Sequence, residues 1–86
     1  MSLTDILGWA GSTEILAAFA LNSFQKMRSD SVAFQLLNLS GASFLIINSI
    51  AHQAYPFTFI NSVWVVISLS ALVKIGMRKH ANTEWD

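Results

Sequence analysis

The chain of 86 residues contains no cysteine, which excludes disulfide bonds and thiol chemistry. Its two histidines, His52 and His80, are far apart, and no group of Cys, His, Asp and Glu has the spacing of a metal site. There is no glycine-rich phosphate loop and no Ser-His-Asp pattern either. We therefore expect no metal, no cofactor and no enzyme activity.

Charged residues are scarce as well. They make up 12% of the chain, about half the share typical of soluble domains, whereas hydrophobic residues make up 53%. The net charge is zero, so electrostatics indicate no nucleic acid partner. From Ser31 to Val73 the chain contains no Asp, Glu, Lys or Arg. Because a helix in water needs a polar face, this run predicts a multi-pass membrane protein surrounded by the lipid bilayer.

Three hydrophobic segments are separated by short polar loops. A helix of about 20 apolar residues is long enough to cross the hydrocarbon core of a bilayer. The predicted membrane-spanning segments are residues 6–24, 32–51 and 56–75, and residues 76–86 are predicted to be a tail with a short helical extension and a loose end. The sequence thus predicts an all-α fold, a single membrane domain built as a bundle of three transmembrane helices.

Local signals mark the helix starts. Ser2-Leu3-Thr4-Asp5 looks like a variant of a capping box, with an acid near the positive end of a helix. Asp30 or Ser31 is a suitable N-cap for the second helix. Pro56 suits the first turn of the third helix, where its missing N–H has no consequence. These signals place the helix starts close to the ends of the apolar segments.

The basic residues indicate how the chain is oriented. All five lie in the first loop or in the tail: Lys26, Arg28, Lys74, Arg78 and Lys79. With three spans these two regions share one side of the membrane, and the positive-inside rule places that side in the cytoplasm. The N-terminus is then outside, with Trp9 and Tyr55 near the outer interface. The basic region of a signal peptide is missing, so we expect the first segment to be retained.

Polar residues recur at helical spacing on the second segment. Asn38, Gly41, Leu45, Asn48 and His52 fall on one stripe, which is too polar to face lipid. His52 lies at the end of this stripe and is interpreted as a residue of the membrane interface.

Asn48 and Asn61 are predicted to lie at one depth, because residues equally far from the turn between two antiparallel helices face each other. Trp9 falls near the same level. Two amides and an aromatic ring suit a small polyhydroxylated or zwitterionic solute. In the alternative interpretation, the two amides hydrogen-bond each other and lock two helices together.

Glu14 is predicted to lie near the middle of the bilayer, with Ser43 and Ser68. An ionisable side chain at that depth costs about 3 kcal/mol on insertion scales, so it is treated as a functional candidate. Glu14 would couple transport to protons, or tune the site, or be a neutral acid bonded to one of the two serines. Trp64 is interpreted as packing or lipid-facing. An inner polar layer is predicted from Asn22, Gln35, Asn38 and Lys74.

The stretch from Gly41 to Asn61 resembles the second and third helices of SemiSWEETs, half-size bacterial sugar transporters of the PQ-loop class. The spacing of Gly41, Leu45, Asn48, a short polar turn, Pro56 and Asn61 matches that pattern without a gap, but the residue types at Leu45 and Asn48 depart from it. The resemblance implies that Asn61 is the pocket asparagine of helix three. It also implies that Leu45 stands at the position of the pocket tryptophan, and Asn48 at that of a nearby pocket aromatic residue.

Over about residues 6–75, the chain is more similar to a small family of uncharacterised bacterial membrane proteins. That resemblance rests on three motifs, one in each helix: Gly8-Trp9-Ala10-Gly11, Asn38-Leu39-Ser40-Gly41 and Asn61-Ser62-Val63-Trp64. This second resemblance implies no function.

The SemiSWEET resemblance implies a homodimer in the bacterial inner membrane, with one pathway along the shared axis. Independently, three helices are too few to enclose a polar pathway, which also indicates a partner surface. The leading hypothesis is alternating-access transport, or binding, of a small polar, sugar-like solute by Asn61, Asn48, Trp9 and Leu45, with Glu14 coupling or tuning. The alternative is a non-transporting membrane subunit or scaffold. A membrane enzyme has little support, because Glu14 has no nucleophile or metal set beside it.

Overall fold

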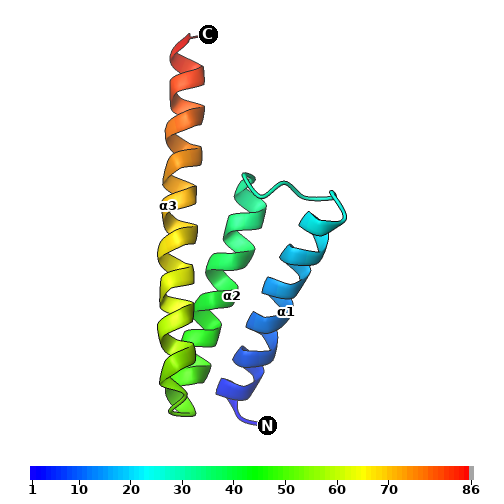
Figure 1. Cartoon of the computed structure of the whole chain (residues 1–86), viewed down its shortest axis with the longest axis vertical. Coiled ribbons are helices and arrows are strands. Elements are labelled where there is room, and N and C mark those ends of the chain that lie inside the picture. The colour runs from blue at the N-terminus through cyan, green and yellow to red at the C-terminus, as the bar shows by residue number, and fades with distance from the viewer. Residues whose placement is uncertain (86) are drawn as a thin grey trace.

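The computed structural model describes the backbone of residues 1–85 and the side chains of residues 1–79. This part of the chain forms three α-helices, α1 (Leu3–Ser23), α2 (Val32–Ala51) and α3 (Tyr55–Trp85) (Figure 1). The predicted all-α, three-helix fold is therefore confirmed. The predicted segment 32–51 coincides with α2, and the segment 6–24 is shifted slightly from α1.

The third helix is longer than its predicted span. It continues without a break from residue 75 to Trp85, where a short extension and a loose end were expected. No proline follows Pro56 to end the helix, and Gly76 is tolerated inside it. Asp86, the end of the predicted tail, lies outside the described residues.

The helix caps agree with the local sequence signals. At the start of α1, the Ser2 hydroxyl accepts a hydrogen bond from the backbone N–H of Asp5 at 3.2 Å. The Asp5 carboxylate accepts one from the backbone N–H of Ser2 at 3.1 Å, which completes the capping box. At the start of α2, Ser31 rather than Asp30 is the N-cap, since its hydroxyl accepts from the backbone N–H of Phe34.

The three helices are arranged with α2 between α1 and α3 (Figure 1). Within the described part of the chain, no Cα atom of α1 lies within 8 Å of one in α3. The N-terminus and the α2–α3 turn are at one end, and the α1–α2 loop is at the other (Figure 1). Helix α2 therefore makes all the contacts that join the other two helices.

Helices α1 and α2 approach closely because glycines face each other. A Cβ atom added to Gly11 would lie 2.5 Å from the carbonyl oxygen of Gly41. One added to Gly41 would lie 2.7 Å from Ile15 and 2.9 Å from the carbonyl oxygen of Gly11. Small residues allow such contacts between membrane helices. The polar stripe predicted on the second helix thus faces α1 at Gly41.

Side-chain hydrogen bonds connect α2 to α3. The indole N–H of Trp64 donates to the amide oxygen of Asn38 at 2.9 Å, and Asn38 is 5% exposed. The hydroxyls of Ser49 and Thr58 are 2.7 Å apart. Trp64, interpreted from the sequence as packing or lipid-facing, therefore also has a polar role.

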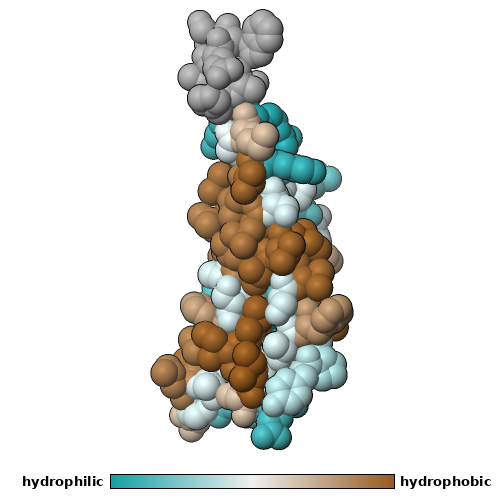
Figure 2. Space-filling model, turned by 90° about the vertical axis from the view of Figure 1, so that its left-hand side faces the viewer, coloured by the Kyte–Doolittle hydropathy of each residue, from teal (hydrophilic) through white to brown (hydrophobic). Residues whose placement is uncertain are grey.

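Few apolar side chains are buried. Among the described residues, the buried hydrophobic side chains are those of Ala18, Ala42 and Ile75. Large side chains of α3 such as Phe59 and Val66 remain exposed, and Figure 2 shows hydrophobic residues across much of this face. Two of the described helices are long and apolar enough to cross a membrane, Val32–Ala51 and Tyr55–Lys79, and α1 is not one of them.

Candidate functional site

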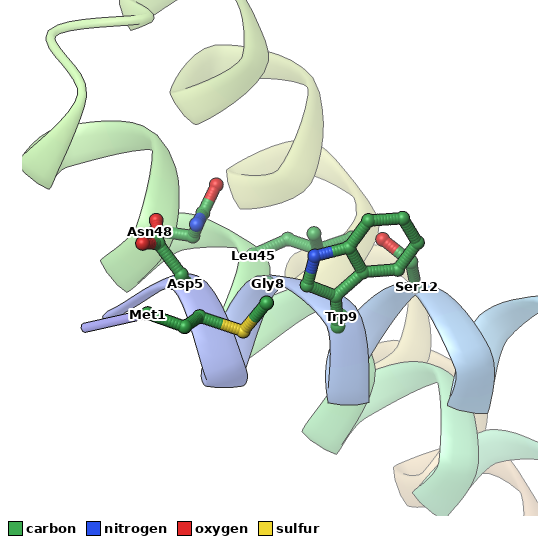
Figure 3. A pocket seen from close by; sticks show the side chains of 7 residues that line it. All are labelled: Met1, Asp5, Gly8, Trp9, Ser12, Leu45 and Asn48. Carbon is green, nitrogen blue, oxygen red and sulfur yellow. The ribbon is translucent and has the colours of Figure 1, made fainter. Parts of the chain in front are cut away.

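Trp9, Leu45 and Asn48 line one cavity at the N-terminal end of α1. Its volume is about 380 Å³, and its other lining residues are Met1, Asp5, Gly8 and Ser12. Figure 3 shows the indole of Trp9 beside Ser12 and Leu45, with Asp5 and Asn48 at the opposite end of the cavity. Helix α1 contributes most of this lining, because Asp5, Gly8, Trp9 and Ser12 follow one another at helical spacing.

A second cavity brings Asn48 and Asn61 together. Its volume is about 320 Å³, and residues from all three helices line it. It shares Ser12, Leu45 and Asn48 with the first cavity. The four residues predicted to bind solute therefore lie around two adjoining cavities. We call this region the amide groove and define it by Asp5, Trp9, Ser12, Leu45, Asn48 and Asn61.

The two amides of the groove do not bond to each other. The Asn48 Nδ2 group donates to the carbonyl oxygen of Thr4 at 2.8 Å, and the Asn61 Nδ2 group donates to that of Phe57, also at 2.8 Å. The Asn48–Asn61 hydrogen bond of the alternative interpretation is therefore not formed. The partners are carbonyl oxygens, so the amide NH₂ groups must face them and the Oδ1 atoms face elsewhere.

Glu14 has a different partner from those predicted. The Ser40 hydroxyl donates to Glu14 Oε2 at 2.5 Å. Ser43 instead donates to the carbonyl oxygen of Leu39 in its own helix, and Ser68 is buried at 2% exposure. Ser40 is favoured because it precedes Gly41, where the backbones of α1 and α2 approach closely. Glu14 lies in the α1–α2 contact and lines neither cavity of the amide groove.

The polar residues of the predicted inner layer bond locally and do not form a joint site. Asn22 donates to the carbonyl oxygen of Met27 at 3.0 Å, and Gln35 donates to that of Ser29 at 2.8 Å. Both bonds hold the α1–α2 loop. Asn38 donates to the carbonyl oxygen of Phe34 and accepts from Trp64. These amides therefore stabilise the α1–α2 loop and the α2–α3 contact.

Asp5 and His52 form a contact that the sequence interpretation missed. Their side chains are 2.9 Å apart and join the start of α1 to the end of α2. The backbone N–H of Ser2 and the His52 side chain both hold the pKa of the Asp5 carboxyl below its usual range. The sequence signal for this contact was that Asp5 lies at the start of the first helix and His52 at the end of the second, which meet when the two helices are antiparallel. Asp5 is therefore an ionised wall of the amide groove at neutral pH.

The opposite end of the molecule carries a second set of ion pairs. Arg28 bonds to Asp30 at 2.9 Å, and Arg78 of α3 approaches the same carboxylate at 3.7 Å. The Arg28 side chain holds the pKa of Asp30 below its usual range. Among the described residues, no group of three or more His, Cys, Asp or Glu residues is placed to hold a metal ion.

No curated protein and no solved structure shows significant similarity to the chain. One family model matches residues 4–79. This range includes the three motifs on which the resemblance to an uncharacterised family rests. Because the match covers far more than half of the sequence, the chain belongs to the family that this model describes, whose members are uncharacterised.

Proposed function

We propose that the chain is a small multi-pass protein of the bacterial inner membrane with three spans. The exposure of its apolar side chains supports this proposal. In the apolar part of α3, Tyr55–Lys79, only Ser68 and Ile75 are buried, whereas the core helix of a soluble protein is mostly buried. Lipid tails would cover these side chains, since acyl chains are as apolar as leucine. Glu14 of α1 would be sheltered by its bond to Ser40 of α2.

The proposed orientation has the N-terminus outside and the C-terminus in the cytoplasm. Loop residue Arg28 and helix residue Arg78 both lie within 4 Å of Asp30, so the two basic regions are at the same end of the molecule. Basic residues favour the cytoplasmic side of a membrane. The amide groove would then open at the outer end.

The proposed activity is binding or alternating-access transport of a small polar solute. The single observation that carries it is that Asn48, Asn61, Leu45 and Trp9, from three helices, surround two adjoining cavities. Concave sites lined by apolar groups and a few oriented polar groups are typical of small-molecule sites. The SemiSWEET-like part of the proposal rests on the sequence resemblance, which places Asn61 in a solute pocket.

A homodimer would complete this site. The groove is lined by three helices of one chain and is open on the side away from α2, so a second copy could close it around a shared pathway. Native mass spectrometry of the protein released from lipid nanodiscs measures this directly. A dimer is expected, and a monomer, or capture only with a different polypeptide, would contradict the self-contained transporter.

Asn61→Val tests the solute site. Asn61 bonds only within its own helix, so the substitution should leave the helix contacts intact. It should reduce uptake at least about tenfold, which corresponds to about 1.4 kcal/mol of lost interaction free energy with the solute. Uptake of labelled polar solutes into proteoliposomes is the measurement.

Ser62→Ala is the matched control for that experiment. The Ser62 hydroxyl makes a similar bond inside α3, to the carbonyl oxygen of Thr58, but it does not line the groove. Uptake by this variant should equal that of the unchanged protein. If the Asn61→Val protein takes up every solute as fast as the unchanged protein does, transport through this groove is excluded.

A non-transporting subunit or scaffold is the second candidate function. It is favoured by the use of polar residues as helix contacts, since Asn48 bonds to Thr4 and Asn38 bonds to Trp64. Under this alternative, substitutions at Asn48 lower the abundance of the protein in the membrane. They change no solute flux per molecule.

A further inference from the structure

The amide groove offers hydrogen-bond acceptors where amides usually offer both donors and acceptors. The NH₂ groups of Asn48 and Asn61 are already bonded to the carbonyl oxygens of Thr4 and Phe57. Within the described part of the chain, neither Oδ1 atom has a hydrogen-bond partner. A solute that reaches these two amides therefore meets partly negative oxygen atoms, which favour a hydrogen-bond donor or a positive charge.

Trp9 adds an aromatic face to the same groove. Its side chain is 68% exposed, and Figure 3 shows the indole beside Ser12 and Leu45 at the edge of the cavity. The face of an indole ring carries negative charge density, and tryptophan is the aromatic residue that attracts cations most strongly.

Asp5 adds a negative charge to the groove, whose lining also includes the N-terminal residue Met1. Asp5 lines the cavity, and the backbone N–H of Ser2 and the side chain of His52 hold its pKa low, so the carboxylate is ionised at neutral pH. Every Lys and Arg of the sequence lies in the first loop or beyond residue 73, at the other end of the molecule. His52 is therefore the only described basic side chain that contacts Asp5.

We propose that the amide groove binds an organic amine or quaternary ammonium compound through its ammonium group, with Trp9 as the aromatic wall and the oxygen atoms of Asp5 and Asn48 in the same cavity as polar partners. This inference rests on the proposed function and names the solute class of that site. A neutral sugar fits less well, because it has no positive charge to pair with the Asp5 carboxylate. An anionic solute would be repelled by Asp5.

Choline and its neutral isostere 3,3-dimethylbutan-1-ol are matched probes for this proposal, and inositol represents neutral polyols. Isothermal titration of the full-length protein, in a polyoxyethylene detergent without amine or sugar headgroups, gives the three affinities. Choline should bind several-fold more tightly than the isostere, because the two differ mainly in the positive charge.

Variants locate that preference. Trp9→Leu should abolish the preference for choline, whereas Trp9→Phe keeps an aromatic face and should retain part of it. Asp5→Asn should weaken choline binding several-fold and leave the isostere unchanged. Phe59→Leu, at a 71% exposed position of α3, is the control and should bind as the unchanged protein does.

Three outcomes would overturn the inference. Equal affinity for choline and the isostere, or a preference that survives Trp9→Leu, would exclude an ammonium site at this groove. Binding of inositol that depends on Asn61, without binding of choline, would overturn the solute class and leave the proposed function standing. Binding of none of the three probes would count against both.

Discussion

At its centre the contact between α1 and α2 depends on side chains that are missing, although three side-chain bonds also cross it, whereas the contact between α2 and α3 depends on side chains that are present. At the first contact, Gly11 and Gly41 bring two backbones together. At the second, Trp64 reaches Asn38, and Ser49 reaches Thr58. Backbone contact cannot adjust to an added atom, while a side-chain bond can be lost without moving the helices. The first contact should therefore be the less tolerant of substitution.

Gly11→Ala should have the largest effect. The new Cβ would lie 2.5 Å from the carbonyl oxygen of Gly41, so the helices must separate. We expect a loss of about 3 kcal/mol of stability, at the upper end of what overpacking costs. Thermal unfolding in detergent, followed by circular dichroism, measures it.

Gly76→Ala is the control for this comparison. A Cβ at Gly76 would have no atom within 4 Å, and alanine favours a helix over glycine by up to about 1 kcal/mol. This variant should unfold at the same or a higher temperature. Equal stability of the Gly11→Ala and Gly76→Ala proteins would show that the α1–α2 contact is not limited by backbone distance.

Trp64→Phe should have an intermediate effect. It keeps the aromatic ring but removes the donor to Asn38, whose oxygen is left unpaired at a buried position. The expected loss of folding stability is about 1 kcal/mol, because a single hydrogen bond between membrane helices contributes only modestly. A double-mutant cycle with Asn38→Leu isolates this bond. Additive effects of the two substitutions would mean that the bond contributes nothing to the α2–α3 contact.

The bonds of the Asp5 carboxylate to Ser2 and His52 should have the smallest effect on stability, and this effect should disappear in acid. The pKa of Asp5 is lowered from the ordinary value of 3.8, so its contribution to stability is present above pH 3.8 and is lost as the pH falls through the lower folded value. The Asp5→Asn protein lacks the carboxylate and therefore lacks this contribution at every pH. The difference in thermal stability between the two proteins should therefore shrink below pH 3.8. A difference that stays constant down to pH 2 would exclude Asp5 as its source.

Local chemistry made the helices predictable. The start of α2 follows from Ser31, whose hydroxyl caps the helix, and the run without charges from Ser31 to Val73 requires two long apolar helices. The proximity of Asn48 and Asn61 followed from simple reflection about a short turn. These inferences need only residues that are close in sequence, or the geometry of one tight connection.

Hydrogen-bond partners were less predictable, because a shift of one helix along another by less than the length of one residue changes which side chains meet. Whether Glu14 meets Ser40 or Ser43 is decided by where α1 crosses α2, which the glycine contact sets. Asn48 bonds to the backbone carbonyl oxygen of Thr4. Every residue has such a group, so the identity of the side chains could not indicate this partner. The continuation of α3 to Trp85 lacked a sequence signal, since no breaker marks the end of its apolar part.

The central position of α2 has a consequence for the order in which the chain is made. Each helix contacts only helices that are next to it in sequence, within the described residues. When α2 leaves the ribosome, α1 is already available, and the pair can complete all its contacts before α3 exists. The last helix then joins an unoccupied side of α2 without displacing anything, so synthesis and assembly can proceed in the same direction.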